Sequence, residues 1–361
     1  MSTIQQQDAK PTTLDSYRLL GRSGLRVSPL ALGTATFGNE LGWGAAQDDA
    51  RTLFASYLER GGNFIDTASA YGGSEKMLGE LIRGKRESLV LATKYTTQRR
   101  PGDPNSGGAH RKNLFASVES SLRQLDTDYL DLLLLHVWDF TTPVEEILRG
   151  LDDLVRQGKV LYVGISSAPA WEISRMQAIA DLRGWSPLVA LQVEYSLINR
   201  GAERDLIPMA RAMGLGVTPF SPLGGGVLSG KYSRVDLAAT SADSGESTRK
   251  SFNANLGMVT ERTLAIADVV REVAEEVERT PAQVALAWNL RNPGVTAPVI
   301  GARTPAQLRG NLAALEVELT AAQLARLDEA SAIDLGYPHD LLAGDHIRAV
   351  TAGGLTIETR R

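Results

Sequence analysis

Short apolar runs recur along the chain, and each is followed by a longer stretch with apolar residues about every three to four positions. Short apolar runs are typical of buried strands, and the longer spacing is typical of amphipathic helices. The fourth run, YLDLLLLH, is apolar on both faces, which indicates a strand buried in a parallel sheet. The predicted strands are Leu30–Gly33, Phe64–Asp66, Leu89–Lys94, Leu130–His136, Val160–Ser166, Val189–Glu194, Gly216–Phe220 and Ala297–Ile300. The predicted helices are Gln47–Arg60, Ser74–Arg83, Arg111–Leu125, Pro143–Gln157, Ala170–Arg183, Glu203–Met213, Thr280–Arg291 and Pro305–Ala313.

Eight alternations of strand and helix predict a closed (β/α)8 TIM barrel, with a doubly wound open sheet as the alternative. Two segments fall outside the alternation. Tyr17–Leu30 has two short apolar runs around a polar turn, which predicts an N-terminal β-hairpin at the barrel bottom. Val227–Val259 is rich in Ser, Asp, Ala and Gly, and we expect a long loop at the C-terminal face of the barrel.

The chain shows neither an internal repeat nor a linker, so we predict one domain over residues 1–361. Within it we expect a disordered leader at 1–15, the barrel at 17–332 and a C-terminal tail at 334–361. The tail mixes polar and apolar residues, and we expect it to add either a wall to the substrate pocket or an oligomer contact.

The composition narrows the class of protein. Hydrophobic residues make up 43% and charged residues 22%, as in a globular protein that forms a large core. The formal net charge of −4 disfavours a broad nucleic-acid-binding surface. The absence of cysteine excludes disulfides, thiolate metal sites and cysteine nucleophiles. The polar first residues lack the apolar segment of a signal peptide, and no long apolar run appears, so we expect a cytoplasmic protein without a membrane partner.

Four residues with acid–base or hydrogen-bonding side chains lie where predicted strands end. Asp66 ends the second strand, Tyr71 lies in the loop that follows it, Lys94 ends the third and His136 ends the fourth. Because active sites of barrels lie at the C-terminal ends of the strands, we expect these residues to converge. Each alone has an ordinary explanation, such as a turn aspartate, a rim aromatic, a solvated lysine or a core histidine.

Together they suit hydride transfer coupled to proton transfer, because an acid must protonate the oxygen of the carbonyl that hydride attacks. An ammonium beside the phenol of Tyr71 lowers its pKa, which is about 10 in isolation. Asp66 would orient Lys94, and His136 would polarise the carbonyl. The alternative for a barrel lysine is a Schiff base in aldol or isomerase chemistry.

The motifs NFIDTASAYGGSE, LVLATKY, YLDLLLLH and GKVLYVGIS closely resemble those of the bacterial-type, NADPH-dependent aldo-keto reductase family. The resemblance runs from about Tyr17 to about Ala332. It implies Tyr71 as general acid/base, Lys94 as the group that tunes its pKa, Asp66 as the lysine partner and His136 as the substrate-orienting group. It also implies reversible hydride transfer without a metal ion.

A phosphate site is expected late in the chain, because no G-x-G-x-x-G follows a strand near its start. Barrels often bind phosphate after the seventh and eighth strands, where this chain has a Gly224–Gly226 run and Arg303 ahead of a helix. The resemblance places Arg303 at the 2′-phosphate of NADPH, Gln307 and Asn311 near adenine, and Phe220 against the nicotinamide. The full set of expected cofactor residues is Gly33, Thr34, Asp66, Ser166, Ser167, Gln192, Phe220, Ser221, Pro222, Leu223, Gly225, Gly301, Arg303, Gln307 and Asn311. Many members have Asn at the position of Ser167, and a serine hydroxyl lacks the reach of that amide toward the carboxamide.

Aromatic residues in the loops after the strands are expected to line the substrate pocket, namely Phe37, Trp43, Tyr95 and Trp138. The sequence thus predicts NADPH-dependent reduction of a small aldehyde or ketone. Two alternatives stay open: an alcohol or sugar dehydrogenase or epimerase step with the same residues, and a nucleotide-binding regulatory subunit with little turnover. The natural substrate and the oligomeric state are not predicted.

Overall fold

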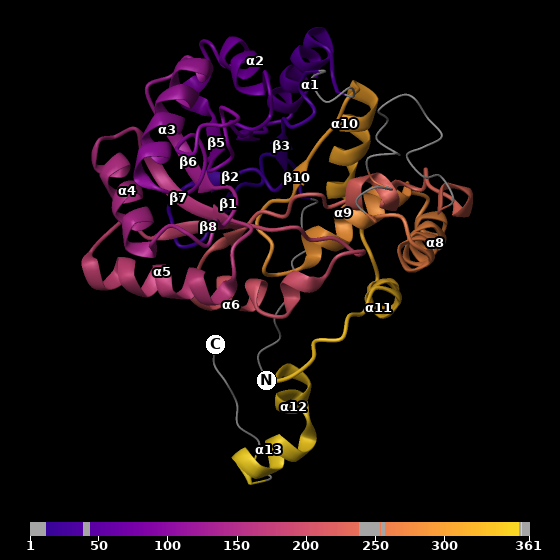
Figure 1. Ribbon diagram of the computed structural model, residues 1–361. Coiled ribbons are helices and arrows are strands. Elements are labelled where there is room, and N and C mark those ends of the chain that lie inside the picture. The colour runs from indigo at the N-terminus through magenta and orange to yellow at the C-terminus, as the bar shows by residue number, and fades with distance from the viewer. Residues whose placement is uncertain (1–11, 39–43, 238–252, 254–256, 354, 356–361) are drawn as a thin grey trace, which may run out of the picture.

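The computed structural model describes residues 12–38, 44–237, 253, 257–353 and 355. Its centre is a sheet of eight parallel strands in the order β10-β3-β4-β5-β6-β7-β8-β9 (Figure 1). The strands are β3 Ala31–Gly33, β4 Phe64–Asp66, β5 Val90–Tyr95, β6 Leu130–Leu135, β7 Val160–Ser166, β8 Leu188–Gln192, β9 Gly216–Val217 and β10 Val299–Ile300.

The first and last strands of that order meet and close the sheet. The backbone N–H of Val299 donates to the carbonyl oxygen of Pro219 at 2.8 Å, and Val217 forms a parallel bridge with Val295. On its other side, β10 pairs with β3, with Val299 opposite Ala31. The prediction of a (β/α)8 barrel is therefore confirmed.

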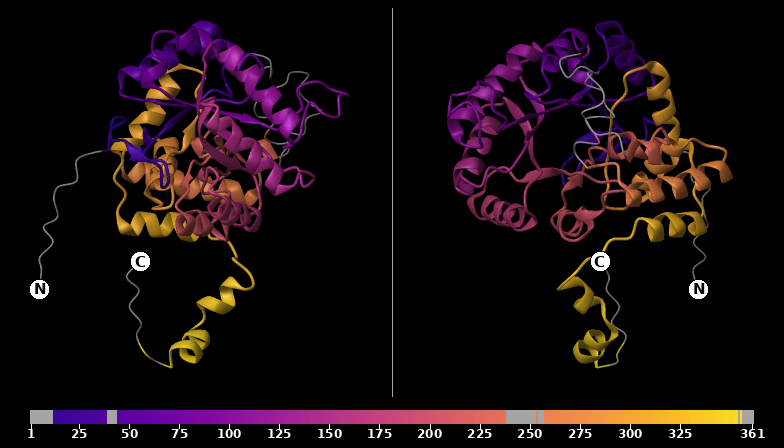
Figure 2. Two further views of the ribbon diagram at one scale, coloured as in Figure 1. Left: turned by 90° about the vertical axis from the view of Figure 1, so that its left-hand side faces the viewer. Right: turned by 45° about the vertical axis from the view of Figure 1, so that its right-hand side comes forward.

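Helices surround the strands as a ring (Figure 2). Each predicted helix has a counterpart, although the ends differ by a few residues. These helices are α1 Gln47–Glu59, α2 Ser74–Leu81, α3 Arg111–Leu125, α4 Val144–Arg156, α5 Ala170–Arg183, α6 Leu206–Met213, α9 Pro281–Arg291 and α10 Pro305–Leu312. Because α1 packs against α10, the ring of helices closes as the strands do.

The predicted hairpin covers the bottom of the barrel. Its strands, β1 Arg18–Leu19 and β2 Arg26–Val27, pair antiparallel. The turn between them packs on the start of β9, where the N–H of Arg22 donates to the carbonyl of Gly214 at 2.7 Å. Gly21 has φ +58°, and a Cβ there would lie 2.4 Å from the carbonyl oxygen of Val189, so this close approach requires glycine.

The alternation of side chains along each strand decides which of them point into the barrel interior. Val90 and Ala92 of β5 point into the interior core, as does Leu134 of β6. Since strand side chains alternate between two faces, the next inward positions are Lys94 and His136. Both come at the C-terminal ends of their strands, where the apolar filling stops and a polar site begins.

Four α-helices of the described residues were not predicted, and two of them, α8 Glu261–Glu276 and α11 Ala321–Ala330, precede the tail. The signal for α8 is present in the sequence, because Thr260 forms a capping box with Thr263, and Leu264, Ala267 and Val270 repeat at helical spacing on the buried face. Strand β9 ends at Val217, well before the predicted Phe220. Pro219, which lacks an N–H group, falls within the predicted extension.

The long loop predicted over Val227–Val259 is described only in part. Two 3₁₀ turns, Gly224–Ser229 and Arg234–Leu237, begin it, and residues 238–252 and 254–256 lie outside the described residues. Residues 1–11 of the predicted leader also lie outside them, whereas Thr13 and Ser16 form a turn.

After α11 the chain leaves the barrel. Two short helices, α12 His339–Ala343 and α13 Asp345–Ala352, extend away from it (Figures 1 and 2). Among the described residues, those that line the cavity near the strand ends all precede α11, so the described part of the tail adds no wall to it. Within the described part of the chain, no helix has the length and apolar character needed to span a membrane.

Candidate active site

A buried ion pair links the ends of β4 and β5. The Nζ of Lys94 donates to Oδ1 of Asp66 at 2.6 Å and to the carbonyl oxygen of Thr67 at 2.8 Å. The side chains of Lys94 and Asp66 are 0% and 3% exposed. Burial alone lowers the pKa of Lys94, but Asp66 and Tyr71 outweigh it and raise that pKa above its usual value. Lys94 is therefore a fixed cation at neutral pH.

Tyr71 lies in the loop between β4 and α2, and its hydroxyl faces the lysine. Nζ of Lys94 donates to Oη of Tyr71 at 3.4 Å, a long hydrogen bond. Burial raises the pKa of Tyr71, and the Lys94 cation opposes this shift without reversing it. Lys94 lowers the pKa of Tyr71 as expected from the sequence, but the expected net decrease is wrong. Desolvation of the phenolate raises this pKa by more than the Lys94 ammonium lowers it.

His136 completes the group from the residue after β6. Its ring lies edge-on to the ring of Tyr71, with centroids 5.9 Å apart. Burial, and secondarily the Lys94 cation, lowers the pKa of His136 to about 4, so the imidazole is neutral near pH 7. Among the described residues its buried Nδ1 finds no hydrogen-bond partner. Because His136 also lines the cavity, its neutral imidazole is suited to offer a ring N–H to a ligand oxygen.

The structure thus brings together all four residues predicted as catalytic. Three of them, Asp66, Tyr71 and His136, line a cavity of about 680 Å³, and Lys94 lies buried behind them. The predicted cofactor residues that line this cavity are Gly33, Asp66, Ser166, Ser167, Gln192, Phe220, Ser221, Pro222, Leu223, Gly225, Gly301, Arg303, Gln307 and Asn311.

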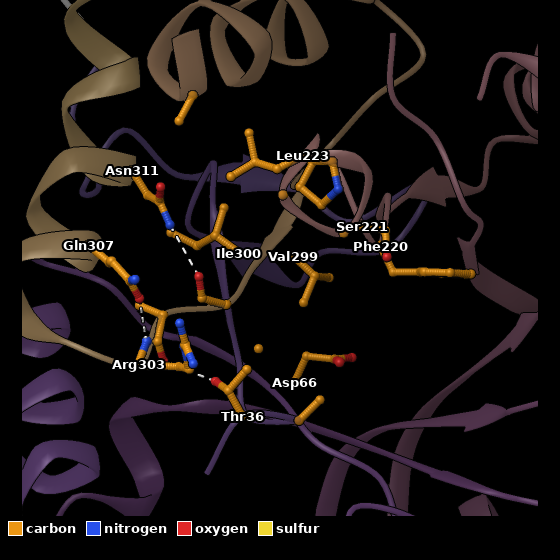
Figure 3. Close-up of a pocket in the computed structure, with 18 of the residues that line it drawn as sticks. Thr36, Asp66, Phe220, Ser221, Leu223, Val299, Ile300, Arg303, Gln307 and Asn311 are labelled. Atoms are coloured by element: carbon orange, nitrogen blue, oxygen red, sulfur yellow. Dashed lines mark hydrogen bonds between the residues drawn. The ribbon is translucent and has the colours of Figure 1, made fainter. Parts of the chain in front are cut away.

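One end of the cavity is lined from α10 (Figure 3). Thr304 caps this helix, and Oε1 of Gln307 accepts a hydrogen bond from the N–H of Arg303 at 2.9 Å. Nδ2 of Asn311 donates to the carbonyl oxygen of Gly301 at 3.2 Å. A helix N-terminus with an adjacent guanidinium is a favourable site for an anion.

Phe220, Ser221 and Leu223 lie at the other side of the cavity (Figure 3). The glycine run that follows has φ values of +54°, +61° and +96° at Gly224, Gly225 and Gly226. Residues other than glycine rarely adopt these φ values. Such a turn allows backbone groups to approach a bound phosphate closely.

Left-handed backbone also occurs at non-glycine residues near the ends of barrel strands. Thr96, Ser167 and Ser221 have φ values of +106°, +48° and +50°. Such strained positions tend to cluster at ligand sites. The hydroxyl oxygens of Ser166 and Ser167 lie 3.3 Å apart, and both residues line the cavity.

Gln192 makes a contact that the sequence did not indicate. Its Nε2 donates to Oδ2 of Asp66 at 2.9 Å, so both carboxylate oxygens of Asp66 are bound by side chains. Thr34 does not line the cavity. Its hydroxyl donates to the carbonyl oxygen of Asp66 and accepts from Oγ of Ser74, so it supports the site from behind.

The four aromatic residues expected in the substrate pocket fall into two groups. Phe37, Tyr95 and Trp138 are buried and are not among the residues that line the cavity, although Trp138 packs edge-on against the exposed ring of Phe140. Trp43 lies outside the described residues. A substrate contact by any of them stays a prediction.

Sequence reasoning also missed several cavity residues. Some of them flank residues that were predicted, as Val137 follows His136, and this adjacency is the available signal. The missed lining residues are Ala35, Thr36, Val137, Ser229, Lys231, Thr280, Ala282, Val299 and Gly310.

The fold and the site define a (β/α)8-barrel protein with a buried acid–base group at the C-terminal ends of its strands. The sequence model of the aldo/keto reductase family matches residues 29–332, and the chain belongs to this family.

Curated relatives cover nearly the whole chain. Norsolorinic acid reductase stcV of Emericella nidulans is 39% identical over 91% of this chain and 84% of its own length. Aldo-keto reductase ausK of Aspergillus calidoustus is 36% identical over 93% of this chain and 87% of its own length. Putative aryl-alcohol dehydrogenase AAD14 of Saccharomyces cerevisiae is 34% identical over 93% of this chain and 92% of its own length. Membership of this family and these names support an oxidoreductase that acts on carbonyl groups.

Proposed function

We propose that the protein catalyses the reversible, NADPH-dependent reduction of an aldehyde or ketone to the alcohol, with Tyr71 as general acid. The observation that carries this proposal is the contact of one buried cation, Lys94, with both Asp66 and Tyr71 beside the cavity. The bacterial-type subdivision expected from the motifs stays a prediction, because the names of the relatives do not address it.

The cavity residues fit a nicotinamide adenine dinucleotide phosphate. Phe220 offers a ring for stacking, the Gly224–Gly226 turn suits a pyrophosphate, and Arg303 stands before a helix N-terminus. When bound, NADPH supplies the hydride. Arg303, at the α10 end of the cavity, supports a preference for NADPH over NADH, because a guanidinium pairs strongly with a phosphate.

The residues of this chain supply the proton. The raised pKa of Tyr71 keeps its hydroxyl protonated near neutral pH, which is the form that donates to a carbonyl oxygen. Lys94 lowers the cost of the phenolate left behind, and Asp66 holds Lys94 charged. The neutral His136 would donate a hydrogen bond to the same carbonyl oxygen and orient it.

The Schiff-base alternative is disfavoured by the state of the lysine. A nucleophilic lysine must lose its proton, whereas Asp66 and Tyr71 raise the pKa of Lys94. The oxidative direction stays open, since relatives are named both as reductases and as dehydrogenases.

The test is NADPH consumption with a panel of aromatic and aliphatic aldehydes and ketones, and NADP⁺ reduction with the matching alcohols. Products from both directions, with carbonyl reduction favoured, support the proposal. Faster alcohol oxidation favours the dehydrogenase. Tight nucleotide binding without turnover on the whole panel favours a regulatory subunit, and absence of nucleotide binding contradicts every one of these readings.

A further inference from the structure

Glu75, the second residue of α2, is a buried carboxyl group that the proposed chemistry does not use. It is 1% exposed and does not line the cavity. Oγ1 of Thr93 donates to its Oε1 at 2.7 Å, and Nε2 of Gln124 donates to its Oε2 at 3.3 Å. Burial raises the pKa of Glu75, with the hydrogen bond from Thr93 as the largest opposing effect. A buried carboxyl is costly, so its position calls for a structural reason.

The contact with Thr93 lies one residue from the proposed chemistry. Thr93 precedes Lys94 on β5, and Glu75 follows closely on the turn that carries Tyr71. That turn is closed by the N–H of Ser74, which donates to the carbonyl oxygen of Tyr71 at 3.0 Å. Any shift of α2 relative to β5 therefore moves Tyr71 relative to Lys94.

The turn is fastened to β5 on both sides of Tyr71. Before it, Oγ of Ser69 donates to the carbonyl oxygen of Lys94 at 3.0 Å. After it, Glu75 accepts from Thr93. The two anchors fall on consecutive residues of one strand, so the segment between them has little freedom to move away from Lys94.

We propose that Glu75 is a positioning residue. By accepting the hydrogen bond of Thr93, it holds Tyr71 at the distance from Lys94 that proton transfer from Tyr71 to the carbonyl requires. The inference rests on the proposed function for its effect on the rate. The long Tyr71–Lys94 contact of 3.4 Å leaves little margin, because small displacements of reacting groups strongly reduce rates.

The experiment compares Glu75→Ala, Glu75→Gln and Thr93→Val with wild type. Gln keeps an oxygen that accepts from Thr93, whereas Ala and Thr93→Val remove the hydrogen bond. Glu80→Gln, on the exposed side of the same helix, is the matched control. We expect kcat to fall at least about tenfold in Glu75→Ala and Thr93→Val. The carbonyl KM and the NADPH Kd should stay within about twofold, and Glu75→Gln should recover most of kcat.

Hydrogen–deuterium exchange of residues 67–74 gives a second readout that needs no turnover. Exchange should rise in Glu75→Ala and Thr93→Val and stay near wild type in Glu75→Gln and Glu80→Gln. An unchanged kcat and exchange in either hydrogen-bond deletion would overturn the proposal, and so would a Glu75→Gln variant as slow as Glu75→Ala. If wild type itself turns over no carbonyl, the proposed function fails, while the exchange pattern still decides whether Glu75 holds the turn.

Discussion

Asp66 and Lys94 form a buried ion pair in which both carboxylate oxygens accept hydrogen bonds. Oδ1 of Asp66 binds Nζ of Lys94 at 2.6 Å, and Oδ2 binds Nε2 of Gln192 at 2.9 Å. The carboxylate therefore joins side chains from three strands, β4, β5 and β8. This arrangement fixes the cation beside Tyr71 before any substrate arrives, which is the preorganisation that electrostatic catalysis requires.

Replacement of Lys94 with Met should destabilise the fold as well as abolish turnover. The change leaves the Asp66 carboxylate buried without its cation, and breaking a buried pair typically costs about 3–5 kcal/mol. The free energy of unfolding, measured with urea, checks this. Arg83→Met is the control, because the Arg83–Asp126 pair is 69% and 63% exposed and its loss should cost less than about 1 kcal/mol. Equal losses in the two variants would show that the Asp66–Lys94 pair is not specially buried.

His136 should make the fold sensitive to acid. Its pKa of about 4 in the folded protein lies below the value of about 6.5 expected when unfolded. The unfolded chain therefore takes up a proton first, and stability present above pH 6.5 is lost as the pH falls. Between pH 7 and pH 5 this group should account for about 2 kcal/mol of lost unfolding free energy. The loss of unfolding free energy between pH 7 and pH 5 should be smaller by that amount in His136→Gln. An identical loss in wild type and His136→Gln would argue against a neutral, buried imidazole.

Arg303→Ala should weaken NADPH binding and leave NADH binding nearly unchanged. The lost charge-assisted hydrogen bonds to a phosphate correspond to roughly a ten- to hundredfold rise in Kd. Titration of tryptophan fluorescence with each nucleotide measures both constants. Arg309→Ala, an exposed position on the same helix outside the cavity lining, should bind both nucleotides as wild type does. A parallel loss of NADH affinity in Arg303→Ala would place the guanidinium elsewhere than at the 2′-phosphate.

The sequence predicts the barrel and the meeting of its polar residues because both follow from strand periodicity. Lys94 and His136 share the inward parity of Ala92 and Leu134, and parallel strands end side by side, so convergence needs no knowledge of side-chain contacts. The hairpin was predictable for a similar reason, since two short apolar runs flank a polar turn.

Features that depend on three-dimensional surroundings were not predictable in this way. Burial outweighs Lys94 in setting the pKa of Tyr71, and the degree of burial is not visible in a motif. Thr34 and Gln192 support Asp66 through contacts between distant segments. Helix α8 has a clear capping box, but it lies directly after a segment whose composition indicates a loop.

In the proposed reaction, Tyr71 delivers the proton while the cavity holds NADPH. The most direct measurement is a single-turnover experiment, in which wild type and Tyr71→Phe are saturated with NADPH and mixed with a carbonyl that wild type reduces. We predict equal nucleotide binding and a rate in Tyr71→Phe lower by about 10²–10⁴-fold, the usual contribution of a general acid. Oxidation of NADPH at the wild-type rate by Tyr71→Phe would contradict the role of Tyr71 as the general acid.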